Sequence, residues 1–196
     1  MGSSDAAEHD LPVRAGYSAV KQRTIDTALR LFSEHGVSGT SLQMIADALG
    51  VTKAAVYHQF RSKDDIVLAV TQGELAWIEE AVEAAEAEAC STRARENLLT
   101  QIVELAVQRR KLVGLLQSDP VIVRLLAGYE PFQMVIERLF AVLIGDTDDP
   151  DIRVKTAMMS AAIGGAAIHP LVVDLDDQTL QRHLLDLTHR LFQLPD

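Results

Sequence analysis

The sequence is poor in cysteine and in long apolar runs. A single cysteine, Cys90, stands among its 196 residues, which excludes an intrachain disulfide and a thiolate metal cluster. Its acidic neighbours disfavour a reactive thiolate, so we interpret it as an ordinary thiol. No apolar run reaches the roughly 18 residues of a membrane span, and no signal-peptide core precedes the first predicted helix. We expect a cytoplasmic protein without a membrane partner.

Residue sets that would support catalysis or hold a cofactor are missing as well. The sequence contains no glycine-rich phosphate loop and no nucleophile elbow. The acidic segment 145–151 is followed by neither the glycine nor the glutamate that a calcium loop requires. His183 and His189 lie six residues apart and face different ways on a helix, so they make no metal pair. We predict no enzymatic activity, no metal and no cofactor.

Strand patterns are also scarce, because no alternating run of β-branched residues occurs. Apolar residues recur instead at helical spacings of three and four. The pattern predicts nine helices, over residues 14–35, 42–49, 53–60, 63–89, 93–117, 120–128, 130–144, 151–168 and 177–194. The predicted fold class is therefore all-α, and the polar first thirteen residues are predicted to form a flexible tail.

The most specific local pattern joins the second predicted helix to the third. Ser41 and Thr52 are good N-cap residues for these two helices. Gly50 stands where a helix favours a left-handed C-terminal residue. Together with Ala46 and Val56, it supplies the small residue, sharp turn and apolar anchor of a helix-turn-helix. That motif places its second helix in the major groove of DNA.

The outward positions of this motif suit contact with a duplex. Lysines meet phosphates or guanine edges, and alanines allow a helix to approach the bases closely. Hydroxyl and imidazole groups donate to phosphate oxygens. Lys63 follows at the start of the next helix, whose N-terminal amides favour an anion. The residues predicted to contact DNA are Thr40, Ser41, Gln43, Thr52, Lys53, Ala54, Ala55, Tyr57, His58 and Lys63.

Charge is distributed unevenly along the chain. The net charge is −10, yet residues 14–63 hold seven Lys or Arg against three Asp or Glu. Residues 64–196 hold eleven against twenty-two. A basic end on an acidic remainder attracts DNA at one place and repels it elsewhere. This asymmetry supports the helix-turn-helix interpretation.

The string GVSGTSLQMIADALGVTKAAVYHQFRSKDDIVLAV resembles the N-terminal domain of the tetracycline-repressor (TetR/AcrR) family of bacterial transcription regulators, over about residues 18–70. The matching elements are Phe32, Gly36, Thr40, Ser41, Ile45, Ala46, Gly50, Val51, Thr52, Lys53, Val56, Tyr57, Phe60, Ser62 and Lys63. Gln59 departs from the aromatic or histidine that is common in relatives. The resemblance implies a dimeric, ligand-responsive repressor, with a helix-turn-helix domain at 14–62 and a larger helical effector-binding and dimerisation domain at 63–196.

The last two predicted helices carry seams of apolar and small residues at alternating spacings of four and three. Such seams pack helices in bundles. A symmetric dimer would also present two DNA-reading helices to half-sites about 34–36 Å apart. The residues predicted to form the dimer are Val154, Met158, Ala161, Gly165, Ile168, Leu180, Leu184, Leu187 and Leu191. The alternative is that both helices pack only within their own chain.

The middle helices are expected, from the resemblance, to enclose a small and largely apolar effector. Such pockets combine apolar walls with a few placed polar groups. Residues that fit this description are Gln101, Leu105, Gln108, Leu112, Phe132, Ile136, Phe140 and Met158, with Met159 as the alternative to Met158. For each of them, core packing or surface exposure is the competing interpretation.

Two other functions remain open at this point. One is an architectural DNA-binding protein without an effector, and the other is a helical small-molecule carrier or sensor whose N-terminal domain binds a protein. The expected partners of the favoured function are a double-stranded operator, a second copy of the chain and the effector.

Overall fold

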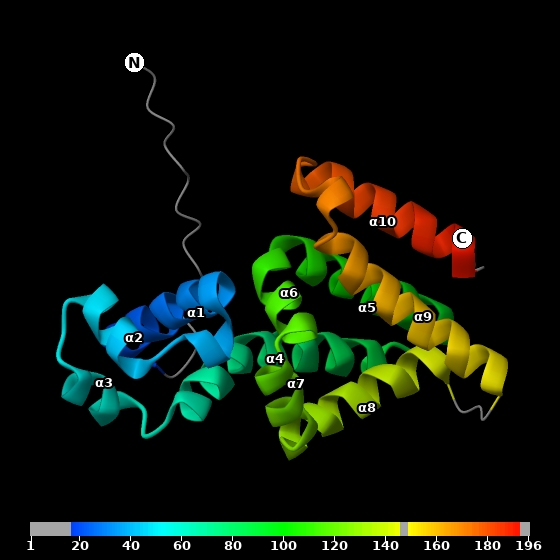
Figure 1. Ribbon diagram of the computed structural model, residues 1–196. Helices are drawn as coiled ribbons and strands as arrows, with labels where there is room; N and C mark the ends of the chain where they lie inside the picture. The colour runs from blue at the N-terminus through cyan, green and yellow to red at the C-terminus, as the bar shows by residue number, and fades with distance from the viewer. Residues whose placement is uncertain (1–16, 146–148, 193–196) are drawn as a thin grey trace.

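Helices account for nearly all of the chain that the structure describes, as predicted (Figure 1). The computed structural model describes residues 17–145 and 149–192, and no strand occurs within these ranges. The predicted tail, residues 1–13, lies outside them. The elements are α1 (Ala19–Gly39), α2 (Leu42–Leu49), α3 (Lys53–Gln59), α4 (Lys63–Ala87), α5 (Ser91–Gln108), α6 (Arg110–Ser118), α7 (Pro120–Ala127), α8 (Glu130–Ile144), α9 (Pro150–Ala167), the 3₁₀-helix η1 (Pro170–Val172) and α10 (Asp177–Phe192).

Short-range signals set the helix ends in the N-terminal part. The hydroxyls of Ser41 and Thr52 each accept the backbone N–H of the third residue beyond them, which caps α2 and α3. Ser62 opens α4 with a capping box. Gly50 ends α2 in the left-handed conformation, with φ 68° and ψ 31°. These are the turn and the caps that the sequence indicates.

One predicted helix is two. The pattern predicted a single helix over 93–117, but the chain breaks at Arg109, where φ is −114° and ψ is 30°. The break redirects the leucine stripe, because Leu98 packs beside α8 while Leu112 packs beside α1 and α7. Arg109 itself lies 3.6 Å from the Glu74 carboxylate of α4. Because no glycine or proline stands at this break, the sequence did not predict it. The described residues therefore form ten α-helices, where the sequence predicted nine.

Three apolar clusters form the core. We call α1–α3 the head and α4–α10 the body; Figure 1 shows the head at one end of the long α4. The first cluster joins the head to the start of α4 and to α6 and α7. The second lies among α5, α9 and α10, and the third among α4, α5 and α8. The head therefore shares its core with three helices of the body, α4, α6 and α7.

Among the described residues, no helix combines the length and the apolar character needed to cross a bilayer.

Candidate nucleic-acid interface

The helix-turn-helix is held by a small buried set of side chains. Ile45 and Ala46 of α2 and Val56 of α3 are fully buried in the first cluster. At the turn, the N–H of Gly50 and that of Val51 donate to carbonyls of the last turn of α2. Because both helices are short, this packing and not helix propensity fixes the angle at which α3 is presented.

The outer face of α3 is open to solvent. Lys53, Ala54, Tyr57 and His58 are all exposed, and Ala55 is half-buried. The Lys53 ammonium lies 5.7 Å from the centre of the Tyr57 ring, so a cation and a phenol stand together beside two small residues. An exposed, cationic helix with little side-chain bulk is the shape that fits a major groove.

Three other residues predicted to contact DNA lie at the N-terminal ends of α2 and α3. Ser41, Gln43 and Thr52 are exposed. The amide of Gln43 donates to Asp47 one turn later, at 2.7 Å. The Thr52 hydroxyl accepts from the backbone while its side chain remains solvent-facing. These three residues stay predictions as DNA contacts, and their exposure is compatible with that role.

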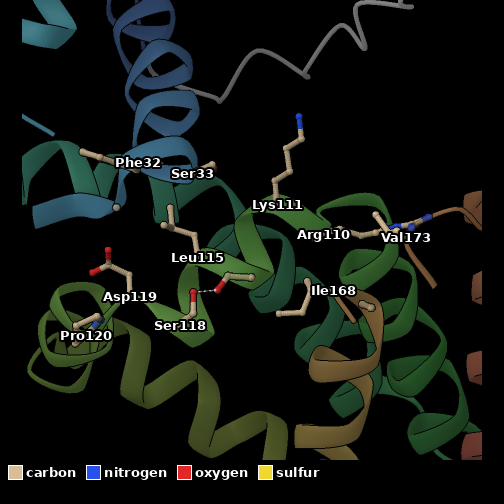
Figure 2. A pocket seen from close by; sticks show the side chains of 13 residues that line it. Phe32, Ser33, Arg110, Lys111, Leu115, Ser118, Asp119, Pro120, Ile168 and Val173 are labelled. Carbon is tan, nitrogen blue, oxygen red and sulfur yellow. Dashed lines mark hydrogen bonds between the residues drawn. The ribbon is translucent and has the colours of Figure 1, made fainter. Parts of the chain in front are cut away.

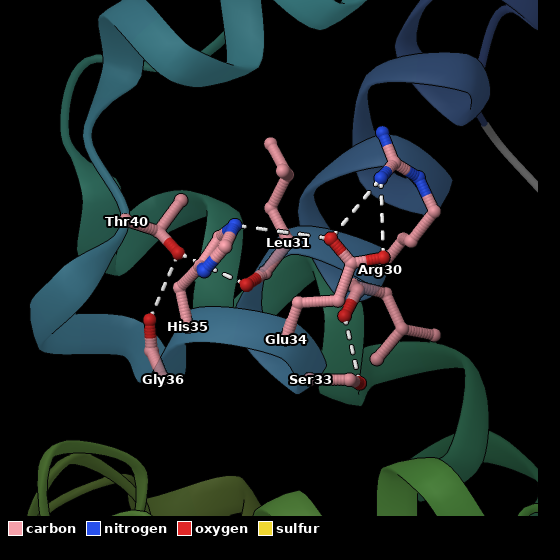
Figure 3. Close-up of polar contacts among 8 residues, drawn as sticks. Arg30, Leu31, Ser33, Glu34, His35, Gly36 and Thr40 are labelled. Carbon is pink, nitrogen blue, oxygen red and sulfur yellow. Dashed lines mark hydrogen bonds and ion pairs between the residues drawn. The ribbon is translucent and has the colours of Figure 1, made fainter.

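Two residues predicted to contact DNA are placed otherwise. Thr40 is buried, and its hydroxyl donates to the carbonyls of Leu31 and Gly36, at 3.2 and 2.8 Å (Figure 3). Lys63 is half-buried, and its ammonium donates to the carbonyls of Val37 and Thr40, at 2.6 and 3.0 Å. We correct the assignment of Thr40, whose buried hydroxyl is committed to the corner between α1 and α2. The Lys63 ammonium uses two of its three donors at the same corner, and its contact with a phosphate stays a prediction.

Gln59, where relatives often carry an aromatic residue or histidine, also has an internal partner. Its side-chain oxygen accepts the hydroxyl of Thr24 on α1 at 2.9 Å. Its amide donates to the carbonyl of Ala55. Gln59 therefore ties α3 to α1.

An apolar cavity of about 180 Å³, partly open to solvent, lies in the body among α4, α5, α6, α8 and α9. Three of the residues predicted to bind effector, Leu105, Ile136 and Phe140, line its wall. The full lining is Ile78, Leu99, Ile102, Leu105, Ala106, Val113, Gln117, Ile136, Leu139, Phe140, Leu143, Met159, Ser160, Ile163 and Gly164. Gln117 and Ser160 are its polar members, and neither stood out in the sequence because both belong to ordinary helical runs.

The other predicted effector residues lie outside this cavity. Met158 and Gln108 are exposed, and the Gln108 amide donates to Glu104 on its own helix. Leu112 and Phe132 pack with the first cluster instead. Gln101 is half-buried and does not reach the cavity wall. Met159, named as the alternative to Met158, does line the cavity. One residue turns the helix by about 100°, and this step separates the exposed Met158 from the buried Met159.

An ion pair braces two walls of the cavity. The Arg138 guanidinium of α8 donates to both carboxylate oxygens of Glu86 on α4, at 3.1 and 2.7 Å. This hydrogen bond holds the pKa of Glu86 below its ordinary value and raises that of Arg138. Both groups face solvent, so the pair adds little to stability.

The seam predicted on α9 is a bare apolar surface. Val154, Met158 and Ala161 are exposed, with Met158 at 62%. A side chain at Gly165 would meet no heavy atom within 4 Å. Ile168 is partly exposed and contacts the backbone position of Gly114 on α6. An apolar stripe left open in one protomer is what a partner surface requires.

The seam predicted on α10 is divided. Leu187 is exposed, but Leu180 and Leu184 are buried in the second cluster with α5 and α9. We correct those two assignments, because a residue already packed in its own protomer is not free to face a partner. Leu191 lies in α10, and its side chain is outside the described part of the chain.

Residues 25–70 match a family model described as "Bacterial regulatory proteins, tetR family". The same region is 54% identical over 46 residues to the HTH-type transcriptional regulator AcrR of Shigella flexneri, covering 24% of this chain and 21% of that protein. It is 45% identical over 47 residues to the biofilm operon negative regulator IcaR of Staphylococcus aureus, covering 24% and 25%. The chain thus matches only about a fifth to a quarter of the length of these curated relatives.

Solved structures share the fold over nearly the whole chain. A bacterial regulatory protein of the tetR family from Rhodococcus RHA1 superposes with a TM-score of 0.68 at 18% identity, covering 92% of this chain and 100% of that one. The transcriptional regulator FadR of Bacillus subtilis, solved in complex with stearoyl-CoA, gives 0.60 at 18%, covering 85% and 96%. At these identities the likeness concerns the fold alone.

Proposed function

We propose that this chain, which belongs by its N-terminal domain to the TetR family of bacterial regulatory proteins, is a ligand-responsive transcriptional repressor. It binds a palindromic operator as a dimer, and a small effector in the body releases it. The observation that carries the proposal is the outer face of α3, where Lys53 and Tyr57 flank two alanines on a packed helix-turn-helix.

The head supplies DNA binding through two kinds of contact. Exposed Lys53, Tyr57 and His58 would meet phosphate oxygens or guanine edges, which position the helix and add cationic attraction. Ala54 and Ala55 would face the base edges and thymine methyls, where the absence of bulk allows close approach. The proposed DNA-binding domain comprises residues 14–62. With this domain on the duplex, the acidic body would lie on the side away from the DNA.

Dimerisation would follow from the bare stripe on α9. Val154, Met158, Ala161 and Gly165 offer an apolar and narrow surface, and Leu187 extends it on α10. A two-fold pairing of this surface with itself would form a four-helix bundle. Two heads on one symmetric body match the symmetry of a palindromic operator.

The effector would occupy the apolar cavity of the body. Its walls are apolar, and Gln117 and Ser160 offer the few polar groups that would fix a ligand's orientation. The cavity of about 180 Å³ is smaller than the usual range of ligand pockets, roughly 300–1,000 Å³. We infer a small, largely apolar effector whose entry enlarges the cavity. The curated relatives named above are regulators and not enzymes, and we place the protein with its DNA in the cytoplasm.

The decisive experiment is a titration of the full-length protein against a duplex from the region upstream of its own gene. A scrambled duplex of equal length is the control, and both are titrated at several salt concentrations. We expect saturable binding to the palindromic duplex, with affinity falling as salt rises. Equal affinity for the scrambled duplex would contradict operator recognition.

The same titration separates the alternatives. An architectural DNA-binding protein would bind DNA, but no ligand would lower its operator affinity. A carrier or sensor whose head binds a protein would show no salt-dependent binding to any duplex. Screening small apolar compounds by thermal stabilisation of the protein, then by operator release, distinguishes these outcomes.

A further inference from the structure

The corner between α1 and α2 determines how the head sits on the body. At Gly36 the helix is interrupted, with φ 70° and ψ 164°, and a last short turn follows. This interruption leaves the N–H of Val37 outside the α1 ladder, since a residue that restarts a helix has no helical acceptor. Thr40 folds back onto the corner and donates to the Gly36 and Leu31 carbonyls (Figure 3).

The acceptor for Val37 comes from the body. Oδ2 of Asp119, at the junction of α6 and α7, accepts the Val37 N–H at 2.7 Å, across 82 positions of sequence. The other oxygen of the same carboxylate caps α7, accepting the N–H groups of Val121 and Ile122 at 2.9 and 3.3 Å. Asp119 is only 8% exposed, so its charge depends on these three donors.

The backbone carbonyl of Val37 also has a charged partner. The Lys63 ammonium, on the first residue of α4, donates to the carbonyls of Val37 and Thr40. The Val37 residue is therefore bound at its N–H by a carboxylate and at its carbonyl by an ammonium. Charge-assisted hydrogen bonds are about twice as strong as neutral ones, which makes this corner a rigid attachment of the head.

Apolar packing fills part of this junction, where Leu115, Ile122 and Leu126 pack in the same cluster as Phe32. Beside that packing, an open cleft of about 540 Å³ lies between α1, α6 and the end of α9, with Phe32 and Ser33 on one wall and Leu115, Ser118 and Asp119 on another (Figure 2). The Asp119–Val37 hydrogen bond adds a polar connection between head and body at the edge of this cleft.

The helix that ends at Asp119 also forms a wall of the apolar cavity. Val113 and Gln117 of α6 line that cavity, and Gln117 is two residues from Asp119. The Gln117 amide fills the space beside Gly164 of α9, where an added Cβ would lie 1.7 Å from its nitrogen. A displacement of α6 by a cavity occupant would thus be applied within one helical turn of Asp119.

We propose that Asp119 is the residue that positions the DNA-reading head on the body, and that its hydrogen bond to Val37 passes a displacement of α6 to the head. The second half of this statement rests on the proposed function; the first half does not. The competing role is that Asp119 only caps α7, which its Oδ1 contacts alone would satisfy.

Two variants separate these roles. Asp119→Ser keeps an N-cap oxygen for α7 but is too short to reach Val37. Asp119→Asn keeps the shape, yet its single amide oxygen serves either α7 or Val37, never both. The matched control is Asp149→Ser, the same change at the N-cap of α9, where the aspartate accepts the N–H of Asp151 and lies in the body.

The first measurement needs no DNA. Amide hydrogen exchange of the full-length chain, followed by NMR, should show Val37 exchanging about tenfold faster or more in Asp119→Ser. In Asp119→Asn, either the Val37 amide or the Val121 and Ile122 amides should exchange faster, but not both sets. The amides of Val121 and Ile122 in Asp119→Ser, and the Val37 amide in Asp149→Ser, should exchange as in the wild type. Unchanged Val37 exchange in Asp119→Ser would overturn the attachment.

A second measurement reads head position. Wild-type protein selects half-sites from a random duplex library, and these are rebuilt with spacers one and two base pairs longer and shorter. We expect a sharp spacing optimum for the wild type, a flattened one for Asp119→Ser, and equal affinity of both for a single half-site. A uniform loss on every duplex would reduce Asp119 to a folding role and refute the proposal. If the wild type selects no duplex, the proposed function fails, while the exchange measurement still decides the attachment.

A third measurement tests transmission. Gly164→Phe places a large side chain where the Gln117 amide lies, since an added Cβ alone would already sit 1.7 Å from that amide nitrogen, and this overpacking disturbs α6 without any ligand. It should shift the spacing optimum in the wild-type background and have no such effect in Asp119→Ser. An equal shift in both backgrounds would show that the displacement reaches the head by a route other than Asp119.

Discussion

The outer faces of α3 and α9 are both built around small residues, but their surroundings differ. On α3, two alanines stand between Lys53 and Tyr57, which offer a positive charge and hydroxyl donors. On α9, Ala161 and Gly165 stand beside Val154 and Met158, which offer only apolar surface. Small residues allow close approach in both cases, and the flanking chemistry favours the occupant that we propose for each: a polyanion for α3 and another apolar helix for α9.

The strongest test of this contrast places a carboxylate on the α3 face. Ala54→Asp should lower operator affinity by about 100-fold or more, since each of the two heads loses roughly 1–3 kcal/mol. An aspartate in the first turn suits the helix dipole, so the head should remain folded. Fluorescence anisotropy with labelled operator measures the loss. Ala84→Asp, on the exposed acidic surface of α4, is the control and should bind as the wild type does.

The next test concerns the corner beside α3. Lys63→Met removes two charge-assisted hydrogen bonds to the Val37 and Thr40 carbonyls, and should lower the free energy of unfolding by about 1.5–3 kcal/mol. Chemical denaturation followed by circular dichroism measures it. The slope of log affinity against log salt tests the predicted phosphate contact of Lys63. A slope reduced by about 1 per head would support that contact, and an unchanged slope would contradict it.

Bulk on the α9 face tests the other half of the comparison. Gly165→Leu should leave the protomer folded, because its side chain enters open space. It should weaken the dimer by about 1–3 kcal/mol through overpacking, which sedimentation velocity detects as dissociation at micromolar concentration. Ala141→Leu, on an exposed position of α8, is the matched control. A Gly165→Leu dimer as tight as the wild type would remove α9 from the interface.

The smallest effect on operator affinity is expected from removing the single positive charge of Lys53. Lys53→Ala should flatten the log–log salt slope by about 1 for each head, with a modest loss of affinity for operator and random duplex alike. Lys155→Ala removes the same charge from α9, where the ammonium pairs with Asp151 at 2.7 Å. Identical salt slopes for the two variants would show that Lys53 meets no phosphate.

The head was readable from sequence because its signals are local. Ser41, Gly50, Thr52 and Ser62 act on backbone groups within a few residues, so their spacing alone predicts two helices and the turn between them. The same local reading misplaced Thr40. A threonine before a helix suits a cap, and only the path of α1 shows that its hydroxyl turns inward.

The body was predicted less well because its decisive contacts are distant. The break at Arg109 follows from the need to pack α5 and α6 in different clusters, which no nearby residue announces. A seam of leucines on α10 predicts burial but not the partner, so Leu180 and Leu184 proved to serve their own protomer. The hydrogen bond between Asp119 and Val37 joins residues 82 positions apart. No periodic pattern in the sequence reports such a contact.

The first apolar cluster has a consequence for exchanging parts between proteins. Leu115 of α6 and Ile122 and Leu126 of α7 pack in the same core as Phe32 of the head. A chimera that transplants only residues 14–62 onto a foreign scaffold would separate these side chains from their neighbours, leaving cavities that each cost several kcal/mol, about 2–5 for a lost leucine or isoleucine. The portable unit is therefore discontinuous in sequence: it comprises the head, the first turns of α4, and the α6–α7 surface on which the head was built.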